Sequence, residues 1–182
     1  LGDGLPNDLI LNKDVAQFLS FQKGSSTQDY PSSLMGSISL IRQTLYDAQW
    51  YQKAQLAYQL NPAQIKPEQN AALAALEGLI SGTDPGIVAV NDELSLLRAA
   101  RISEEFGLKL IYKASGYEYR RLEAIRSLNA TLIVPLNFPE APNVSTPEVE
   151  ADVSLGDLKH WDTAPENPGR LGKANVRFAF TS

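Results

Sequence analysis

The chain has 182 residues, of which 43% are hydrophobic and 20% are charged, and its formal net charge is −5. This length and composition are typical of one globular domain, and the acidic balance argues against a nucleic-acid-binding surface. The absence of cysteine excludes a disulfide framework and a thiolate metal site. No apolar run approaches the roughly 18 residues that span a bilayer, so no membrane span is predicted.

The first part of the chain, up to residue 82, has the apolar periodicity of helices. Its predicted elements are a short apolar-periodic segment over 9–21, a long helix over 32–60 closed by Asn61-Pro62, and a helix that starts at Lys66-Pro67-Glu68. The stretch 81–86, rich in Gly, Pro and Asp, then breaks the pattern. We therefore expect a mainly helical segment over 1–82.

The second part, residues 86–182, alternates between short β-branched runs and helical patterns. Strands are predicted at 87–90, 108–112, 131–134 and 176–182, with helices over 93–106 and 117–128 between the first three. Only a crossover helix returns the chain to begin a neighbouring strand in the same direction. The sequence therefore predicts an α/β segment with a parallel sheet of about four strands and crossover helices.

The stretch between the third and fourth strands has a different character. Residues 135–153 are rich in Pro and Glu and are expected to be irregular. A short helix over 154–163 follows, with Ser154 as its predicted cap, and another helix covers 168–174.

Functional side chains of parallel sheets lie at the carboxyl ends of the strands. Four residues occupy such places here, and we predict them to bind substrate: Asn91, Asp92, Lys113 and Asn137. Three of them have a simpler alternative. Asp92 can cap the next helix, Lys113 can be an exposed cation, and Asn137 can belong to a rigid loop that covers a sheet end.

Two further positions invite a functional interpretation. The turn that contains Gly116 leads to Tyr117-Glu118, where the positive end of a helix could accept an anion. His160 is the only histidine. Because it lies inside a predicted helix and far from any strand end, we expect a surface or cap residue and not a catalytic one.

Several longer segments carry a likeness to a known family. They are Tyr30 to Tyr51, Pro135 to Pro142, Leu155 to Pro168, and the aromatic run Phe178-Ala-Phe180. Together they resemble the amidohydrolase superfamily, and most of all imidazolonepropionase-related bacterial proteins, including large secreted ones. The resemblance covers nearly the whole chain. It implies a partial (β/α) barrel of the TIM-barrel type, excised from a longer protein and preceded by a helical segment, with a periplasmic or secreted location.

The resemblance also implies a metal site, usually Zn²⁺, that ionises a bound water near neutral pH. The His-x-His pair of an early strand does not occur in this chain. Asn91 and Lys113 stand where later strands would supply ligands, and the late aspartate would follow Ser182. None of the family's metal ligands has a counterpart in this sequence. We therefore expect no metal in this chain, and a divalent metal such as Zn²⁺ only in the longer protein.

These observations lead to two hypotheses about function. The first is a fragment of a metal-dependent amidohydrolase that cleaves a C–N bond of a cyclic or linear amide; the fragment itself is expected to be inactive. Its partners would be a small-molecule amide substrate and the rest of the barrel. The alternative is a metal-free barrel that serves as a binding or scaffolding module. A Rossmann-like domain is disfavoured because no Gly-x-Gly-x-x-Gly follows any strand.

Overall fold

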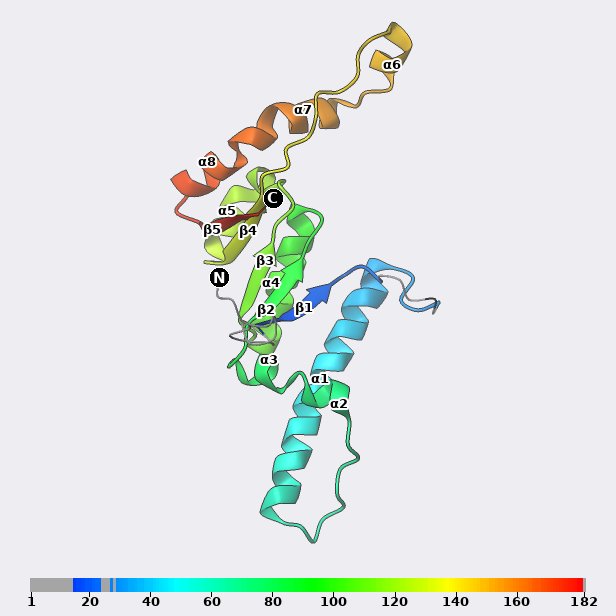
Figure 1. The fold of residues 1–182 in the computed structure, drawn as a ribbon, viewed down its shortest axis with the longest axis vertical. Coiled ribbons are helices and arrows are strands. Elements are labelled where there is room, and N and C mark those ends of the chain that lie inside the picture. Colours follow the sequence, from blue (N-terminus) through cyan, green and yellow to red (C-terminus); the bar gives the residue numbers. More distant parts are fainter. Residues whose placement is uncertain (1–14, 24–26, 28, 182) are drawn as a thin grey trace, which may run out of the picture. The chain divides into compact units, whose positions relative to one another are not determined.

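The computed structural model describes residues 15–23, 27 and 29–181. The chain divides into two compact units, Leu1–Ile87 with Phe106–Lys109 and Val88–Glu105 with Leu110–Ser182. One five-stranded sheet has the strand order β1-β2-β3-β4-β5 (Figure 1). Its strands are β1 (Gln17–Ser20), β2 (Gly86–Ala89), β3 (Leu110–Lys113), β4 (Thr131–Pro135) and β5 (Arg177–Thr181).

The long helix predicted in the first unit is confirmed as α1 (Leu34–Leu60). It begins where the Ser33 side chain accepts a hydrogen bond from the Gly36 N–H, at 3.1 Å. It ends at Asn61, whose N–H still donates to the Ala57 carbonyl. The hydroxyl cap at one end and the Asn61-Pro62 pair at the other therefore set both limits locally.

The helix predicted to start at Lys66 begins later and is divided into α2 (Ala71–Ala74) and α3 (Glu77–Ser81). The Asn70 side chain caps α2 by accepting from the Leu73 N–H at 3.1 Å. Asn is a stronger N-cap than the residues before it, so the helix starts there. Gly82, with φ of 72°, ends α3 in the left-handed conformation that glycine adopts without strain.

The first strand corrects the helical prediction for the amino-terminal segment. Residues 17–20 form β1, and the Gln17 N–H donates to the Pro85 carbonyl at 3.1 Å. The rest of that predicted element, 9–14, lies outside the described residues. An isolated short segment does not sustain a helix, whereas a sheet edge satisfies its backbone groups directly.

The parallel sheet predicted for the second unit is confirmed. β3 pairs with β4 in parallel, with Tyr112 opposite Leu132, and β4 pairs with β5 in parallel, with Leu132 opposite Phe178. The fold class is therefore α/β, as expected, and consistent with part of a barrel. The sheet has five strands instead of about four because β1 was expected to be helical.

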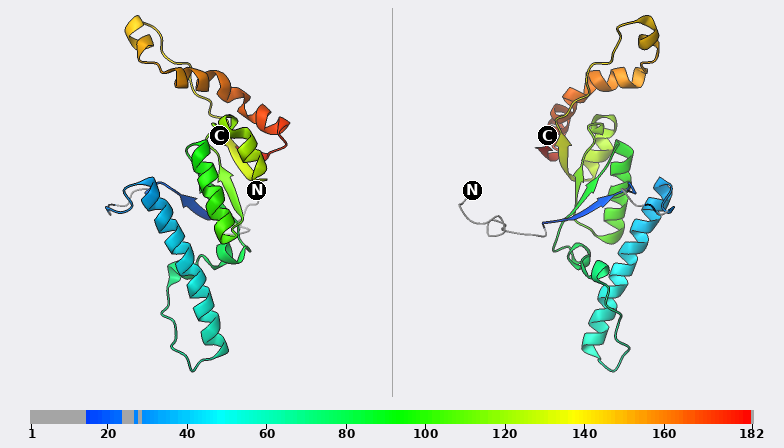
Figure 2. Two further views of the ribbon diagram at one scale, coloured as in Figure 1. Left: turned by 180° about the vertical axis from the view of Figure 1, so that it is seen from behind. Right: turned by 45° about the vertical axis from the view of Figure 1, so that its right-hand side comes forward.

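The helices of the second unit follow the prediction with two exceptions. The prediction is confirmed for three helices: α4 (Glu93–Phe106), α7 (Leu155–Thr163) and α8 (Asn167–Lys173). Figure 2 shows α4 alongside β3. A 3₁₀ turn, η3 (Ala164–Glu166), lies between α7 and α8. The helix predicted over 117–128 is instead a 3₁₀ turn, η2 (Glu118–Arg121), and then α5 (Leu122–Ser127). α6 (Pro147–Ala151) forms inside a stretch predicted to be irregular, because Thr146 caps it and Pro147 suits its first turn.

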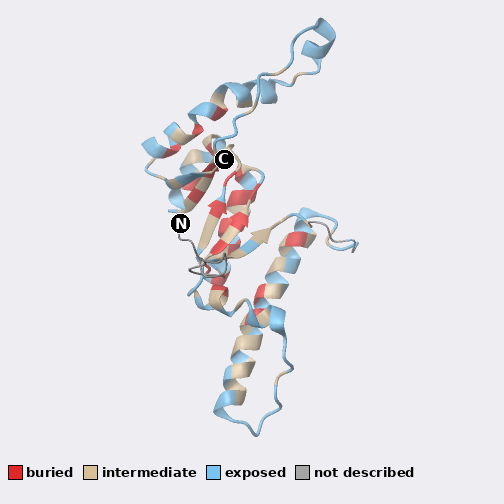
Figure 3. Ribbon diagram, in the orientation of Figure 1, coloured by how far each residue is buried: buried red, intermediate tan, exposed pale blue. Residues whose placement is uncertain are grey.

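Burial alternates along β2 and β4. Leu132 and Val134 of β4 are fully buried, whereas Thr131, Ile133 and Pro135 are only partly covered. Figure 3 shows the buried residues concentrated on these strands and on α4, while α6 is exposed throughout. Lys113 pairs with Ile133 in the parallel register, so its side chain belongs to the less covered face. Among the described helices, none is long and apolar enough to cross a membrane.

Candidate functional site

The predicted site residues lie at or just after the ends of strands, at a common edge of the second unit. Val90 directly follows β2, and its N–H donates to the Lys113 carbonyl at 3.1 Å. Asn91 therefore lies beside the end of β3. The Leu136 N–H donates to the Thr181 carbonyl at 2.9 Å, so Asn137 begins the loop beyond β4 and β5. Asn91, Lys113 and Asn137 are all exposed. Within the described part of the chain, no hydrogen bond joins their side chains to one another.

Asp92 has the role that its alternative interpretation predicted. Its carboxylate accepts a hydrogen bond of 2.6 Å from the Ser95 N–H, at the start of α4. Such a bond satisfies one of the free amide groups of the first helical turn. The carboxylate therefore stabilises the start of α4, directly after Asn91.

This cap leads to a testable difference between two variants. Asp92→Ala is expected to lower the free energy of unfolding by about 1 kcal/mol, whereas Asp92→Asn should keep most of the stability because the amide oxygen still accepts the Ser95 N–H. Denaturant unfolding of the chain measures both. Asp162→Ala, which removes an exposed carboxylate of α7, is the control. Equal losses for the Ala and Asn variants would contradict a capping role.

The loop after β3 binds a carboxylate of the chain itself and not an external anion. Glu118 is fully buried, and its Oε1 accepts from the Ser115 N–H at 2.8 Å and from the Ser115 hydroxyl at 3.1 Å. The Gly116 N–H donates to both carboxylate oxygens, at 3.2 and 3.1 Å. Gly116 has φ of 90°, a conformation that favours glycine. The anion site considered at Tyr117-Glu118 is therefore occupied by a carboxylate of the chain itself.

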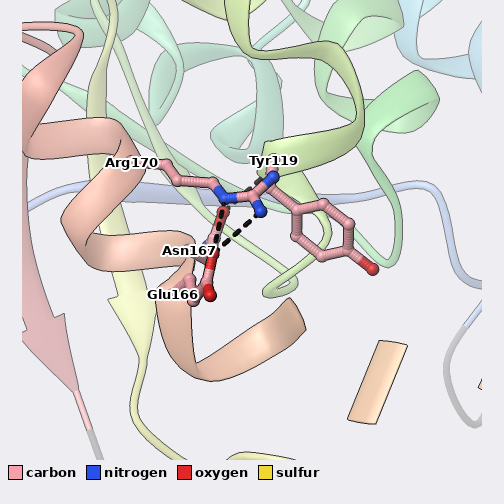
Figure 4. Close-up of polar contacts among 4 residues, drawn as sticks. All are labelled: Tyr119, Glu166, Asn167 and Arg170. Atoms are coloured by element: carbon pink, nitrogen blue, oxygen red, sulfur yellow. Dashed lines mark hydrogen bonds and ion pairs between the residues drawn. The ribbon is translucent and has the colours of Figure 1, made fainter. Parts of the chain in front are cut away.

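A second buried polar side chain completes this network. The Asn167 amide, at the start of α8, donates to Glu118 Oε2 at 2.7 Å and accepts from the Tyr119 N–H at 2.9 Å. Figure 4 shows Asn167 beside Tyr119, together with the ion pair between Arg170 of α8 and Glu166 of η3. That pair is largely exposed and contributes little to stability. Asn167 therefore ties α8 to the loop that follows β3.

His160 of α7 packs against the same region. Its ring stacks on the Tyr117 ring with centroids 3.8 Å apart and planes at 17°, and its Nδ1 lies 3.1 Å from the Tyr119 hydroxyl. Burial lowers the pKa of His160, and the nearby Arg120 charge lowers it further, against the opposing charges of Asp157 and Glu118. The neutral imidazole is thus favoured.

The surface position expected for His160 is therefore only partly right. The residue is half-buried and contacts residues that lie about 40 positions earlier in the chain. No local pattern pairs His160 with Tyr117 or Tyr119, so sequence reasoning missed this cluster and also the Glu118–Asn167 pair. The nearest available signal was the alternation Tyr117-Glu118-Tyr119 after a strand end.

The residues of this region do not fit a zinc site. Zinc needs three or four nitrogen, sulfur or carboxylate ligands, and the described residues contain no group of three or more His, Cys, Asp and Glu that could hold a metal ion. Asn91 and Lys113 are poor ligands for a transition metal, and the Glu118 carboxylate is already engaged. What the sheet edge offers is neutral amides and one cation, which suit hydrogen bonding to a polar or anionic organic group.

Comparison with known proteins gives one informative result. No family model matches the chain, and no curated protein matches it. A solved structure, of an amidohydrolase from Thermotoga maritima MSB8, superposes with a TM-score of 0.71 over 96% of this chain, at 19% sequence identity. The chain has the fold of part of an amidohydrolase. It spans 43% of that protein's length, and at this identity the likeness concerns the fold.

Proposed function

We propose that this chain is part of the TIM-type barrel of a metal-dependent amidohydrolase related to imidazolonepropionases. The reaction would be hydrolysis of a C–N bond in a cyclic or linear amide. The observation that carries the proposal is the likeness in fold to an amidohydrolase over nearly all of this chain. The parallel strands of the second unit support it, because such sheets place their chemistry at the strand ends where Asn91 and Lys113 lie.

Within this proposal the exposed strand-end residues contact the substrate. The side-chain amides of Asn91 and Asn137 each offer a donor and an acceptor, which match the N–H and C=O of an amide. The Lys113 ammonium is suited to a carboxylate or to the carbonyl oxygen, where negative charge develops during hydrolysis. Asp92 stabilises the start of α4, directly after Asn91, by the hydrogen bond that its carboxylate accepts from Ser95.

The metal is assigned to the rest of the longer protein, because the described residues do not fit a metal site. This chain by itself is accordingly proposed to be inactive. The remaining part of the barrel is its proposed partner, and it would bring histidine and acidic ligands from the other strand ends.

Metal analysis of the longer protein beside this chain, together with a hydrolase screen on cyclic and linear amides, tests the proposal. We expect stoichiometric divalent metal and amide hydrolysis in the longer protein and neither in this chain. In the longer protein, Lys113→Met should raise KM or lower kcat, while Lys173→Met, a change at an exposed position of α8, should do neither. Stoichiometric metal in this chain alone would overturn the ligand assignment.

The second candidate function is a metal-free binding or scaffolding module, since a shared fold does not determine function. It is favoured by the neutral Asn91 and cationic Lys113 at the places where the resemblance leads one to expect ligands. The same experiment separates the two: a longer protein that is folded, free of metal and inactive on all amides would support the module.

A further inference from the structure

The packing of His160 on the residues after β3 is a second notable feature of this unit. The imidazole lies parallel to both the Tyr117 ring and the Tyr119 ring, with interplanar angles of 17° and 16°. The Arg120 guanidinium is 4.3 Å from the centroid of the Tyr117 ring. A cation therefore already lies against the aromatic cluster that receives His160.

The carboxylates near this cluster are engaged elsewhere. Glu118 accepts from the Ser115 and Gly116 backbone and from Asn167. Asp157 accepts the Ser154 hydroxyl at 2.6 Å at the start of α7.

The other nearby carboxylates interact with arginine side chains. Glu166 is paired with Arg170, whose guanidinium lies 5.9 Å from the Tyr119 ring centroid. The negative charge of buried Glu93 favours the charged form of Arg120. No carboxylate among the described residues is hydrogen-bonded to His160, so a proton on its ring would lack a direct acidic partner.

We propose that the contact of α7 with Tyr117 and Tyr119 is a pH-sensitive latch, closed when His160 is neutral and loosened when His160 is protonated. The charged ring would be added beside Arg120 and would lose solvation without gaining a carboxylate. α8 is held separately by Asn167, so loosening is confined to α7. The inference is independent of the proposed enzymatic function.

The direction of the pH effect follows from linkage. The ordinary pKa of histidine is about 6.5, and burial and Arg120 lower the pKa of His160 in the folded chain. The unfolded chain then binds the proton more tightly, so acid favours unfolding of this contact. Its stabilising contribution is complete above pH 6.5 and falls as the pH drops from there towards the lowered pKa of the folded chain.

The chain allows a clean test because it has one histidine and two tryptophans. The imidazole NMR signal belongs to His160 alone, and Trp50→Phe leaves Trp161, the next residue along α7, as the only fluorescent indole. We expect His160 to titrate with a midpoint below 6.5 and the Trp161 emission to shift to the red over the same pH range. In the His160→Phe variant, which keeps a stacking ring that cannot ionise, the emission should not change between pH 5 and 8.

Arg120→Gln provides a second measurement if His160→Phe does not fold. Removing that positive charge should move the midpoint of His160 upward, towards 6.5. Lys159→Gln, a change at an exposed cation on α7, is the matched control and should leave the midpoint in place. A midpoint at or above 6.5 in the parent sequence, or a red shift of Trp161 that persists in His160→Phe, would overturn the latch.

Discussion

Replacing Glu118 by alanine is expected to lower the free energy of unfolding by about 3 kcal/mol. The carboxylate is fully buried and accepts hydrogen bonds from the Ser115 and Gly116 backbone amides and from the Asn167 side chain. The variant leaves these donors without a partner, and each buried unsatisfied group costs about 1–3 kcal/mol. For a chain of this size the unfolding midpoint should fall by roughly 6–12 °C.

Thermal unfolding measures the overall loss, and hydrogen exchange of the Ser115 and Gly116 amides locates it. Both amides should exchange faster in Glu118→Ala. Glu118→Gln should be intermediate, because one amide oxygen replaces two carboxylate oxygens and its NH₂ group faces donors. Glu123→Ala, at a side chain that is 80% exposed, is the control and should change stability by less than about 0.5 kcal/mol. Unchanged exchange at Ser115 and Gly116 would refute the stabilising role of the Glu118 carboxylate.

Truncating Leu132 to alanine should cost about 3 kcal/mol. The side chain is fully buried and belongs to β4, which pairs with β3 and with β5. The cost combines the lost burial of three carbon atoms with the cavity that remains, and core Leu→Ala changes range over about 2–5 kcal/mol. Denaturant unfolding should show a lower midpoint.

Two further variants make this result specific to buried volume. Leu132→Ile keeps the side-chain volume and should cost less than about 1.5 kcal/mol. Leu136→Ala removes a side chain that is 43% exposed and should be much closer to neutral. If Leu136→Ala destabilised the chain as much as Leu132→Ala, the burial pattern of β4 would be wrong.

Elements with local start signals were predictable from sequence. α4 and α7 begin where expected because Asp92 and Ser154 cap them with side-chain oxygens three residues before the bonded amide. α1 is long enough for its apolar period to be read and is bounded by Ser33 and Asn61. For these helices the deciding interactions lie within a few residues of one another.

The candidate site was predictable only in part. Placing Asn91 and Lys113 at strand ends required only the strand–helix alternation, and the parallel pairing confirms the direction of β3 and β4. The anion site considered at Tyr117-Glu118 could not be judged from sequence, because a spacing pattern does not reveal that Glu118 folds back onto its own loop.

The amino-acid sequence by itself determined the α/β class, the parallel course of the strands and the limits of α1, α4, α7 and α8, because periodicity, caps and crossover lengths are properties of short segments. Tertiary structure alone decided that residues 17–20 form β1, since a four-residue strand depends on the neighbour to which it hydrogen-bonds. It also decided the pairing of Glu118 with Asn167 and of Tyr119 with His160. These partners are 49 and 41 residues apart, and only the packing of α7 and α8 on the residues after β3 brings their atoms within hydrogen-bonding distance.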